Sequence, residues 1–297
     1  MSETSPKNPQ SLAVGVRDLI QALYRKGGLS SLQYSELTAR QGTRTHQAFF
    51  NLLDTQYLQF QVERELTLSY NWSNPDPEDD FIKSITVRGR ADILLTPQED
   101  SRAISFHNFG EKLEEPLIVE VKTVASALDL LPEDGEIMHW YQARMYTYLY
   151  YKTRDTSPPE NVTYALAYVS AETLEAKYYK KEEAFRDLEK WFDQSLRDYL
   201  KLARSIRFWW DKRNRSIDAL SFPYPNLRAG QRSFIEHAYK AIEEITPFLA
   251  QAPTGIGKTM SALYPAIKQL RHGHFDHIFY LTAKRSTRLV AENALED

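Results

Sequence analysis

The chain of 297 residues has 42% hydrophobic and 26% charged residues, the composition of an ordinary globular protein long enough for about two domains. Its net charge of -3 excludes global basicity, so any nucleic-acid surface must be local. The absence of cysteine excludes disulfides, thiolate zinc sites and an iron–sulfur cluster in this chain. No apolar run approaches the ~20 residues that span a bilayer, and the polar N-terminus lacks a signal-peptide core. We therefore expect a cytoplasmic protein with no membrane partner.

The first part of the chain predicts an α/β domain over residues 11–215, after a disordered N-terminus at residues 1–10. Apolar residues at helical spacing predict a helix over 11–28, which Gly27 and Gly28 end. The loop at 71–80, with two prolines and several acids, should be exposed. The other expected elements are a helix at 45–54, strands at 57–70, 82–95 and 117–123, a helix at 136–151, strands at 162–169 and 174–180, and a charged helix at 182–210.

The composition changes at residues 216–227, which contain two prolines and no helical period, so we place a domain boundary there. A second domain, residues 216–297, then shows a helix at 228–245, a strand at 247–251, a glycine loop, another helix and a strand at 277–282. This order is typical of a parallel sheet with crossover helices.

The string APTGIGKT, formed by Ala252, Pro253, Thr254, Gly255, Ile256, Gly257, Lys258 and Thr259, lies between the expected strand and helix. A phosphate-binding loop needs glycines so that backbone N–H groups can wrap the phosphates. It also needs a lysine for the β- and γ-phosphates and a hydroxyl for Mg²⁺. These residue types are present, so the string predicts an ATP site.

Arg228 and Gln231 precede this loop by one helix, and YLTAKRSTR (280–288) follows it. Together these motifs resemble superfamily 2 helicases of the DinG/XPD-like branch over residues 220–297. The resemblance implies that Arg228 and Gln231 contact the adenine and that the domain is the incomplete start of a RecA-like motor. The chain ends before an acidic Mg²⁺ motif, so we expect ATP binding without hydrolysis by these residues alone.

The strand LIVEVKT (117–123) places Glu120 and Lys122 on one face and an apolar set on the other. Asp92 lies on the polar face of the strand expected at 82–95. If the strands pair, two carboxylates could share a divalent cation beside a lysine, which suits phosphodiester hydrolysis. A Glu–Lys pair at a strand edge with an unrelated surface aspartate is the alternative.

Two further pieces flank these strands. His46 lies on an apolar helical stripe, where a histidine is either a core residue or a ligand. Gln142 and Tyr146 share one face of the helix at 136–151, which also carries His139. Simple packing of an amphipathic helix on the sheet is the alternative.

In order, these motifs read GTRTH, GRAD, EVK and QARMY, a series that resembles the RecB-like branch of the PD-(D/E)XK nucleases over residues 12–180. The resemblance implies a restriction-endonuclease-like mixed sheet flanked by helices. It also implies Mg²⁺ or Mn²⁺ held by His46, Asp92, Glu120 and the Val121 carbonyl. Asp92, Glu120 and Lys122 would be catalytic, and Gln142 and Tyr146 would support the site or contact DNA.

The segment ARSIRFWWDKRNR (203–215) combines basic and aromatic residues, which suits single-stranded nucleic acid or packing between domains equally well. The whole sequence predicts a nuclease–helicase of DNA repair that acts on DNA, preferably single strands. Two alternatives stay open, a nuclease fold kept as an inactive DNA-binding platform and an N-terminal domain that serves only protein contacts. The sequence does not predict the oligomeric state.

Overall fold

The computed structural model describes residues 11–26, 39–56, 60–76, 81–97, 115–125, 128–155, 157–283 and 285–296. The predicted disordered residues 1–10, the glycine stop at 27–28 and the end of the 71–80 loop lie outside these ranges. The chain divides into two compact units, residues 1–202 and 203–297. The division falls inside one long helix, α4 (Phe185–Ala219), earlier than the boundary we expected at 216. None of the described helices is both long and apolar enough to cross a membrane.

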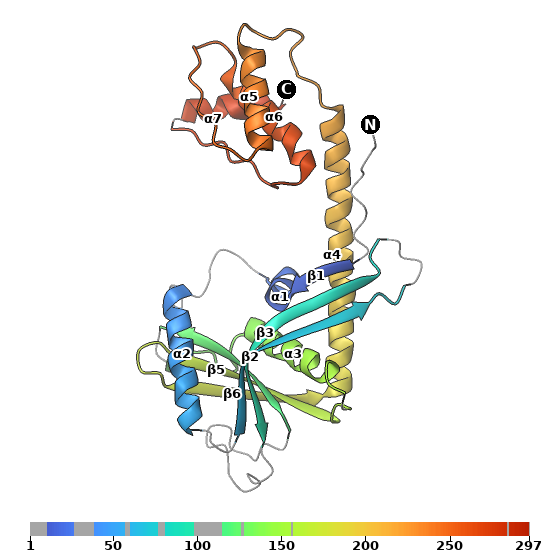
Figure 1. Ribbon diagram of the computed structural model, residues 1–297, viewed down its shortest axis with the longest axis vertical. Helices are drawn as coiled ribbons and strands as arrows, with labels where there is room; N and C mark the ends of the chain where they lie inside the picture. Colours follow the sequence, from blue (N-terminus) through green and yellow to red (C-terminus); the bar gives the residue numbers. More distant parts are fainter. Residues whose placement is uncertain are drawn as a thin grey trace. The chain divides into compact units, whose positions relative to one another are not determined.

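The N-terminal unit is an α/β fold built on a six-stranded mixed sheet (Figure 1). Its strands run in the spatial order β1-β3-β4-β5-β6, with β2 pairing on β3. β1 pairs with β3, and β4 with β5, in parallel, while the other pairs are antiparallel. The strands are β1 (Ser11–Gly15), β2 (Phe60–Ser73), β3 (Ser84–Pro97), β4 (Leu117–Val124), β5 (Asn161–Ser170) and β6 (Ala176–Ala184).

Two helices cover opposite faces of the sheet. α2 (Ala39–Gln56) packs Phe49, Phe50 and Leu53 against the face formed by the odd-numbered residues of β4. α3 (Ile137–Lys152) packs Trp140 and Ala143 against residues of β5 on the opposite face. The face that carries Glu120 and Lys122 is therefore also covered by a helix, which explains why Glu120 is buried.

Strand β3 changes partner along its length, and this opens a fork in the sheet. Its first part pairs with β1 as far as Arg88, and its last part pairs with β4 from Ile93. Residues 89–92 of β3 lie between these two pairings. From Glu120 onward, β4 pairs with β5, so β3 and β4 diverge at this point. Asp92 and Glu120 lie where the two strands separate.

The helix predicted over 11–28 is wrong in its first five residues. Residues Ser11–Gly15 form β1, and the helix α1 begins at Val16 and ends at Tyr24. The helical spacing of the apolar residues persists from Val16 onward, where Leu19 and Ile20 are fully buried. The preceding residues instead add a parallel strand to β3, because pairing with a distant strand outweighs weak local helix propensity.

The C-terminal unit contains, beyond the end of α4, the helices α5 (Gln231–Glu243), α6 (Lys258–Gln269) and α7 (Arg285–Glu296) and the short turn η3 (Leu270–His272). The strands predicted at 247–251 and 277–282 are wrong, since both segments are described and neither forms a helix or a paired strand. Leu249 is 100% exposed and Leu281 is 89% exposed. A strand needs a hydrogen-bonded neighbour, and within the described residues neither segment has one.

Candidate functional site

The fork between β3 and β4 brings the predicted nuclease residues together. Lys122 Nζ donates to Oε1 of Glu120 at 2.5 Å, so the two charges of this strand form an ion pair. The backbone N–H of Val121 donates to Oδ2 of Asp92 at 2.7 Å. The Asp92 carboxylate therefore takes a place that a neighbouring strand would occupy in an unbroken ladder. This contact fixes Asp92 beside the strand that carries Glu120.

The Glu120 carboxyl is fully enclosed, and its environment opposes ionisation. Burial raises the pKa of Glu120, Lys122 opposes this shift and the charge of Asp92 adds to it, with the net result that the pKa is about 7. Among the described residues, Oε2 of Glu120 finds no hydrogen-bond partner. Burial also raises the pKa of Asp92, against the effects of Lys122 and of the Val121 N–H. A buried acceptor without a donor is costly, so a cation that contacted this oxygen would stabilise the carboxylate.

The residues present fit a hard divalent cation in part. Two neighbouring carboxylates, one with an unpartnered buried oxygen, supply the oxygen ligands that Mg²⁺ and Mn²⁺ prefer. His46 on α2 lies near enough for Glu120 and Lys122 to influence its pKa, which burial lowers. Among the residues that the structure describes, however, no three His, Asp or Glu side chains form a group that could hold an ion together.

Gln142 and Tyr146 both lie on the buried side of α3. The Tyr146 ring packs on Gly89, the glycine of the GRAD motif, where a Cβ atom would come within 2.7 Å of Cε1. Burial raises the pKa of Tyr146, and the charges of Glu120 and Asp92 add to this effect. Tyr146 thus closes the fork from the α3 side, next to both carboxylates.

The sequence reasoning missed two contributors to this region. Tyr168 of β5 lies opposite Lys122 in the ladder, and its hydroxyl accepts the Glu136 N–H at 2.8 Å and contacts His139 Nδ1 at 2.8 Å. Which of the two atoms donates to the other depends on the tautomer of His139. Burial lowers the pKa of His139 to about 3, and Lys122 adds to this effect. The helical spacing that places His139, Gln142 and Tyr146 on one face could have assigned His139 to this region. Tyr168 could be assigned to it only from the register of the strands.

The second missed residue is Glu65 of β2. It lies between the ladder pairs Arg64–Ile93 and Leu66–Ala91, which places it across from Asp92. Its φ of 50° is unusual for a residue with a side chain, and its carboxylate pairs with Arg90 at 3.3 Å. Glu65 also helps to raise the pKa of Asp92. The sequence does not show whether Glu65 or Glu63, two residues earlier, lies across from Asp92, because the strand register decides this.

The glycine loop of the C-terminal unit closes around its own lysine. Lys258 Nζ donates to the carbonyl oxygens of Ala252 at 3.0 Å and Pro253 at 2.9 Å. Gly255 and Gly257 have φ values of 93° and 85°, a region that favours glycine. The helix α6 begins at Lys258, directly after the loop. The backbone conformation of the loop thus favours glycine at both positions, and the carbonyl groups of the loop bind the lysine side chain.

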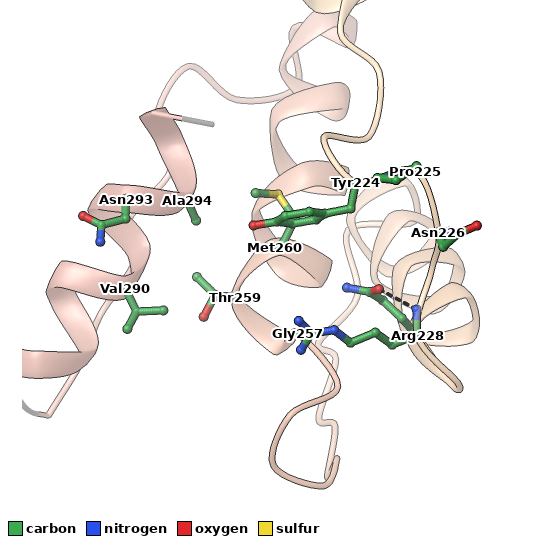
Figure 2. Close-up of a pocket in the computed structure, with 11 residues that line it drawn as sticks. Tyr224, Pro225, Asn226, Arg228, Gly257, Thr259, Met260, Val290, Asn293 and Ala294 are labelled. Carbon is green, nitrogen blue, oxygen red and sulfur yellow. Dashed lines mark hydrogen bonds between the residues drawn. The ribbon is translucent and has the colours of Figure 1, made fainter.

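A cavity of about 510 Å³ lies beside this loop (Figure 2). Gln231 Oε1 accepts the Arg228 N–H at 3.0 Å, and the Arg228 guanidinium donates to the Gly255 carbonyl. Four predicted ATP-binding residues line the cavity, namely Arg228, Gln231, Gly257 and Thr259. Tyr224, Pro225, Asn226, Met260, Val290, Asn293 and Ala294 complete its lining. The other predicted loop residues lie outside the lining, namely Ala252, Pro253, Thr254, Gly255, Ile256 and Lys258.

Comparison with known proteins gives little further information. No family model and no curated protein matches the chain. Five chains of solved structures match. One of them, described as the crystal structure of SSO0001, is 15% identical and covers 62% of this chain and 75% of its own, with a TM-score of 0.36. A likeness at this level defines neither a fold nor a function for the chain.

Proposed function

We propose that the N-terminal unit is a metal-dependent nuclease that hydrolyses DNA phosphodiester bonds in a restriction-endonuclease-like, RecB-like fold. The observation that carries this proposal is the buried Glu120 carboxyl, which has an unpartnered oxygen, a pKa raised to about 7 and Asp92 and Lys122 as neighbours. An environment that opposes two neighbouring negative charges becomes favourable once a divalent cation neutralises them.

The chain's own residues divide the chemistry in a definite way. Asp92 and Glu120 would hold Mg²⁺ or Mn²⁺, with His46 and the Val121 carbonyl as the further ligands that the family resemblance implies. The ion, when bound, polarises the phosphate and lowers the pKa of a bound water. Lys122, whose Nζ bonds Glu120, would orient an attacking water and offset negative charge at the phosphate. Gln142 and Tyr146 would keep the β3–β4 fork in place or contact DNA.

Cleavage of end-labelled DNA by the purified chain tests this proposal. With Mn²⁺ or Mg²⁺, we expect cleavage that favours single strands. Asp92→Asn and Lys122→Ala should each lower the rate by about 100-fold or more. The exposed Asp129 and Lys190 of the same unit provide matched controls, since Asp129→Asn and Lys190→Ala should cut at the wild-type rate. Equal cutting by all four variants would overturn the assignment.

A second candidate is a nuclease fold that binds DNA without cutting it. It is favoured by the lack of a three-ligand group among the described residues and by the direct Glu120–Lys122 pair. Calorimetric titration with Mn²⁺ separates the two candidates. The nuclease should show a heat of metal binding that disappears in Asp92→Asn, whereas a platform should show no heat of metal binding.

We propose for the C-terminal unit that it binds ATP, as the beginning of a RecA-like motor of the DinG/XPD-like type. The supporting observation is the cavity beside Gly257 and Thr259, with Lys258 held by two carbonyl groups that phosphates could replace. Lys258→Ala should weaken binding of a fluorescent ATP analogue at least about tenfold. Lys240→Ala, an exposed lysine of the same unit, is the control.

Lys258→Ala and Asp92→Asn also test whether the N-terminal unit is only an accessory of the motor. If cleavage or strand separation by a longer form of the protein required Lys258 and ignored Asp92, the N-terminal unit would serve protein contacts only. Under the nuclease proposal, cleavage requires Asp92 whether or not ATP is present.

A further inference from the structure

The part of α4 that belongs to the C-terminal unit carries exposed aromatic rings among basic side chains. Phe208 is 68% exposed, Trp209 56% and Trp210 39%. Residues 203–215 contain five basic residues and one acid, Asp211, in a chain whose net charge is -3. Neither the carboxylate site nor the ATP cavity uses any of these residues. This segment is therefore a separate surface that needs its own explanation.

One face of this segment is fixed to its own unit. Arg213 donates to the Leu270 carbonyl at 3.1 Å, and Ile217, which is buried, accepts a hydrogen bond from Lys268 at 2.6 Å. Arg213 and Ile217 are four residues apart, so they share one side of the helix. The opposite side is consequently directed away from α6 and η3.

The side of α4 that is directed away from α6 and η3 carries basic side chains on both sides of an aromatic ring. Arg204, Phe208, Lys212 and Arg215 recur at i, i+4, i+8 and i+11, the spacing of one helical face, and all four are exposed. Trp209 lies four residues before Arg213, on the side of the helix that Arg213 and Ile217 share, yet its ring is 56% exposed and the Arg213 guanidinium lies 5.4 Å from its centre. From Arg204 to Arg215 the face extends about 16 Å along the helix axis. Asp211 pairs with Arg207 at the edge of this face, which leaves the face with a net positive charge.

We propose that this segment of α4, with the face formed by Arg204, Phe208, Lys212 and Arg215 and the separately exposed ring of Trp209, binds single-stranded nucleic acid. Exposed rings stack on bases that are not already paired, while the basic side chains bind the phosphates between them. A helix that lies on a membrane would instead segregate its apolar residues from its cations, whereas Phe208 lies between Arg204 and Lys212 on one stripe. The positive charge complements phosphate and opposes most basic partners.

This surface is distinct from the proposed nuclease and ATP sites. Binding to it is therefore measured under conditions in which neither of those sites is active. Fluorescence anisotropy of a labelled oligothymidylate of about 20 nucleotides is measured with the full chain, in EDTA and without ATP. We expect saturable binding that weakens between about 50 and 200 mM salt. The double variant Phe208→Ala, Trp209→Ala should bind at least about fivefold more weakly. Phe279→Ala, which removes a ring that is 82% exposed in the same unit, should have no effect.

Two further variants separate binding from folding. Trp209→Phe keeps a stacking ring and should retain most of the affinity. Lys212→Gln should lower both the affinity and the salt dependence, whereas Lys190→Gln, on the same helix but outside the face, should leave both unchanged. Wild-type affinity in the double alanine variant would overturn the proposal. Stronger binding to vesicles of equal parts phosphatidylserine and phosphatidylcholine, lost in the same variants while oligonucleotide binding persists, would also overturn it. Neither result depends on whether the chain cuts DNA.

Discussion

Tyr146 lies so close to Gly89 that a Cβ atom at this position would come within 2.7 Å of the ring and 3.0 Å of the hydroxyl. The same Cβ would also lie 3.1 Å from a methyl group of Val16. Gly89 is in β3 at the start of the fork, and Tyr146 is in α3, next to both carboxylates. The glycine is thus explained by the close approach of an aromatic ring, which keeps α3 against the fork.

Gly89→Ala should therefore lower the free energy of unfolding by about 1–3 kcal/mol and reduce cleavage, because the methyl group overpacks this contact. Urea unfolding measures the loss. Combined with Tyr146→Ala, the two effects should be far from additive, since the smaller side chain leaves room for the methyl group. For the unfolding measurement Gly42→Ala is the control, because no described atom beyond its chain neighbours and its own helix backbone lies within 4 Å of its Cβ position and alanine favours a helix. Additive losses would show that the contact does not govern this site.

The raised pKa of Glu120 predicts a specific pH dependence. The folded protein holds the Glu120 proton up to about pH 7, whereas an unperturbed glutamate loses it near 4.5. The contribution of this group to the free energy of unfolding is therefore present below about pH 4.5 and is lost as the pH rises through 7. Glu120→Gln should remove this part of the pH dependence in urea unfolding measured from pH 5 to 8. An unchanged profile would contradict the pKa shift.

Metal binding should depend on pH through the same Glu120 proton. A carboxyl must be ionised to bind Mn²⁺, so the affinity should fall about tenfold for each pH unit below 7. Calorimetry in two buffers of different ionisation enthalpy should detect about one proton released for each ion bound at pH 6. Asp129→Asn is the matched control, since it changes an exposed carboxyl and should alter neither quantity. A pH-independent affinity would mean that Glu120 is not a ligand.

The Tyr168 hydroxyl should matter more than an ordinary hydroxyl, because it bonds both the Glu136 N–H and His139 Nδ1. Tyr168→Phe should lower the free energy of unfolding at pH 7 by about 1–3 kcal/mol, since two partly buried partners lose their bond to the buried Tyr168. Tyr179→Phe removes one bond, to the Pro132 carbonyl, and should cost less. His139 should stay neutral from pH 8 down to about 4 by NMR, and titration near its ordinary pKa would contradict this arrangement.

Gln231 should be required for nucleotide binding because it connects the Arg228 backbone to the glycine loop. Its Nε2 lies only 2.5 Å from the Cβ position of Gly257, so it packs directly on the loop. Gln231→Ala should weaken binding of a fluorescent ATP analogue about tenfold or more. Gln269→Ala, which removes an equally buried glutamine that bonds Tyr239 outside the cavity, should leave the affinity unchanged. Equal effects would show that loss of stability accounts for both.

The sequence by itself determined the features that depend on local pattern. Alternation of side chains along LIVEVKT places Glu120 and Lys122 on one face of the strand. Helical spacing places Gln142 and Tyr146 on one face of α3. The glycine loop and the start of α6 at Lys258 also follow from local residues, because positive φ angles and a helix N-terminus have local causes.

Only the tertiary structure decided which segments pair. Residues 11–15 join β3 as a strand, and the predicted strands at 247–251 and 277–282 do not form, because hydrogen-bond partners come from distant parts of the chain. The fork that lets Asp92 accept the Val121 N–H, and the register that selects Glu65 and Tyr168, are likewise non-local. Periodicity fixes the face on which a side chain lies, but the energy of pairing and burial between remote segments fixes its neighbours.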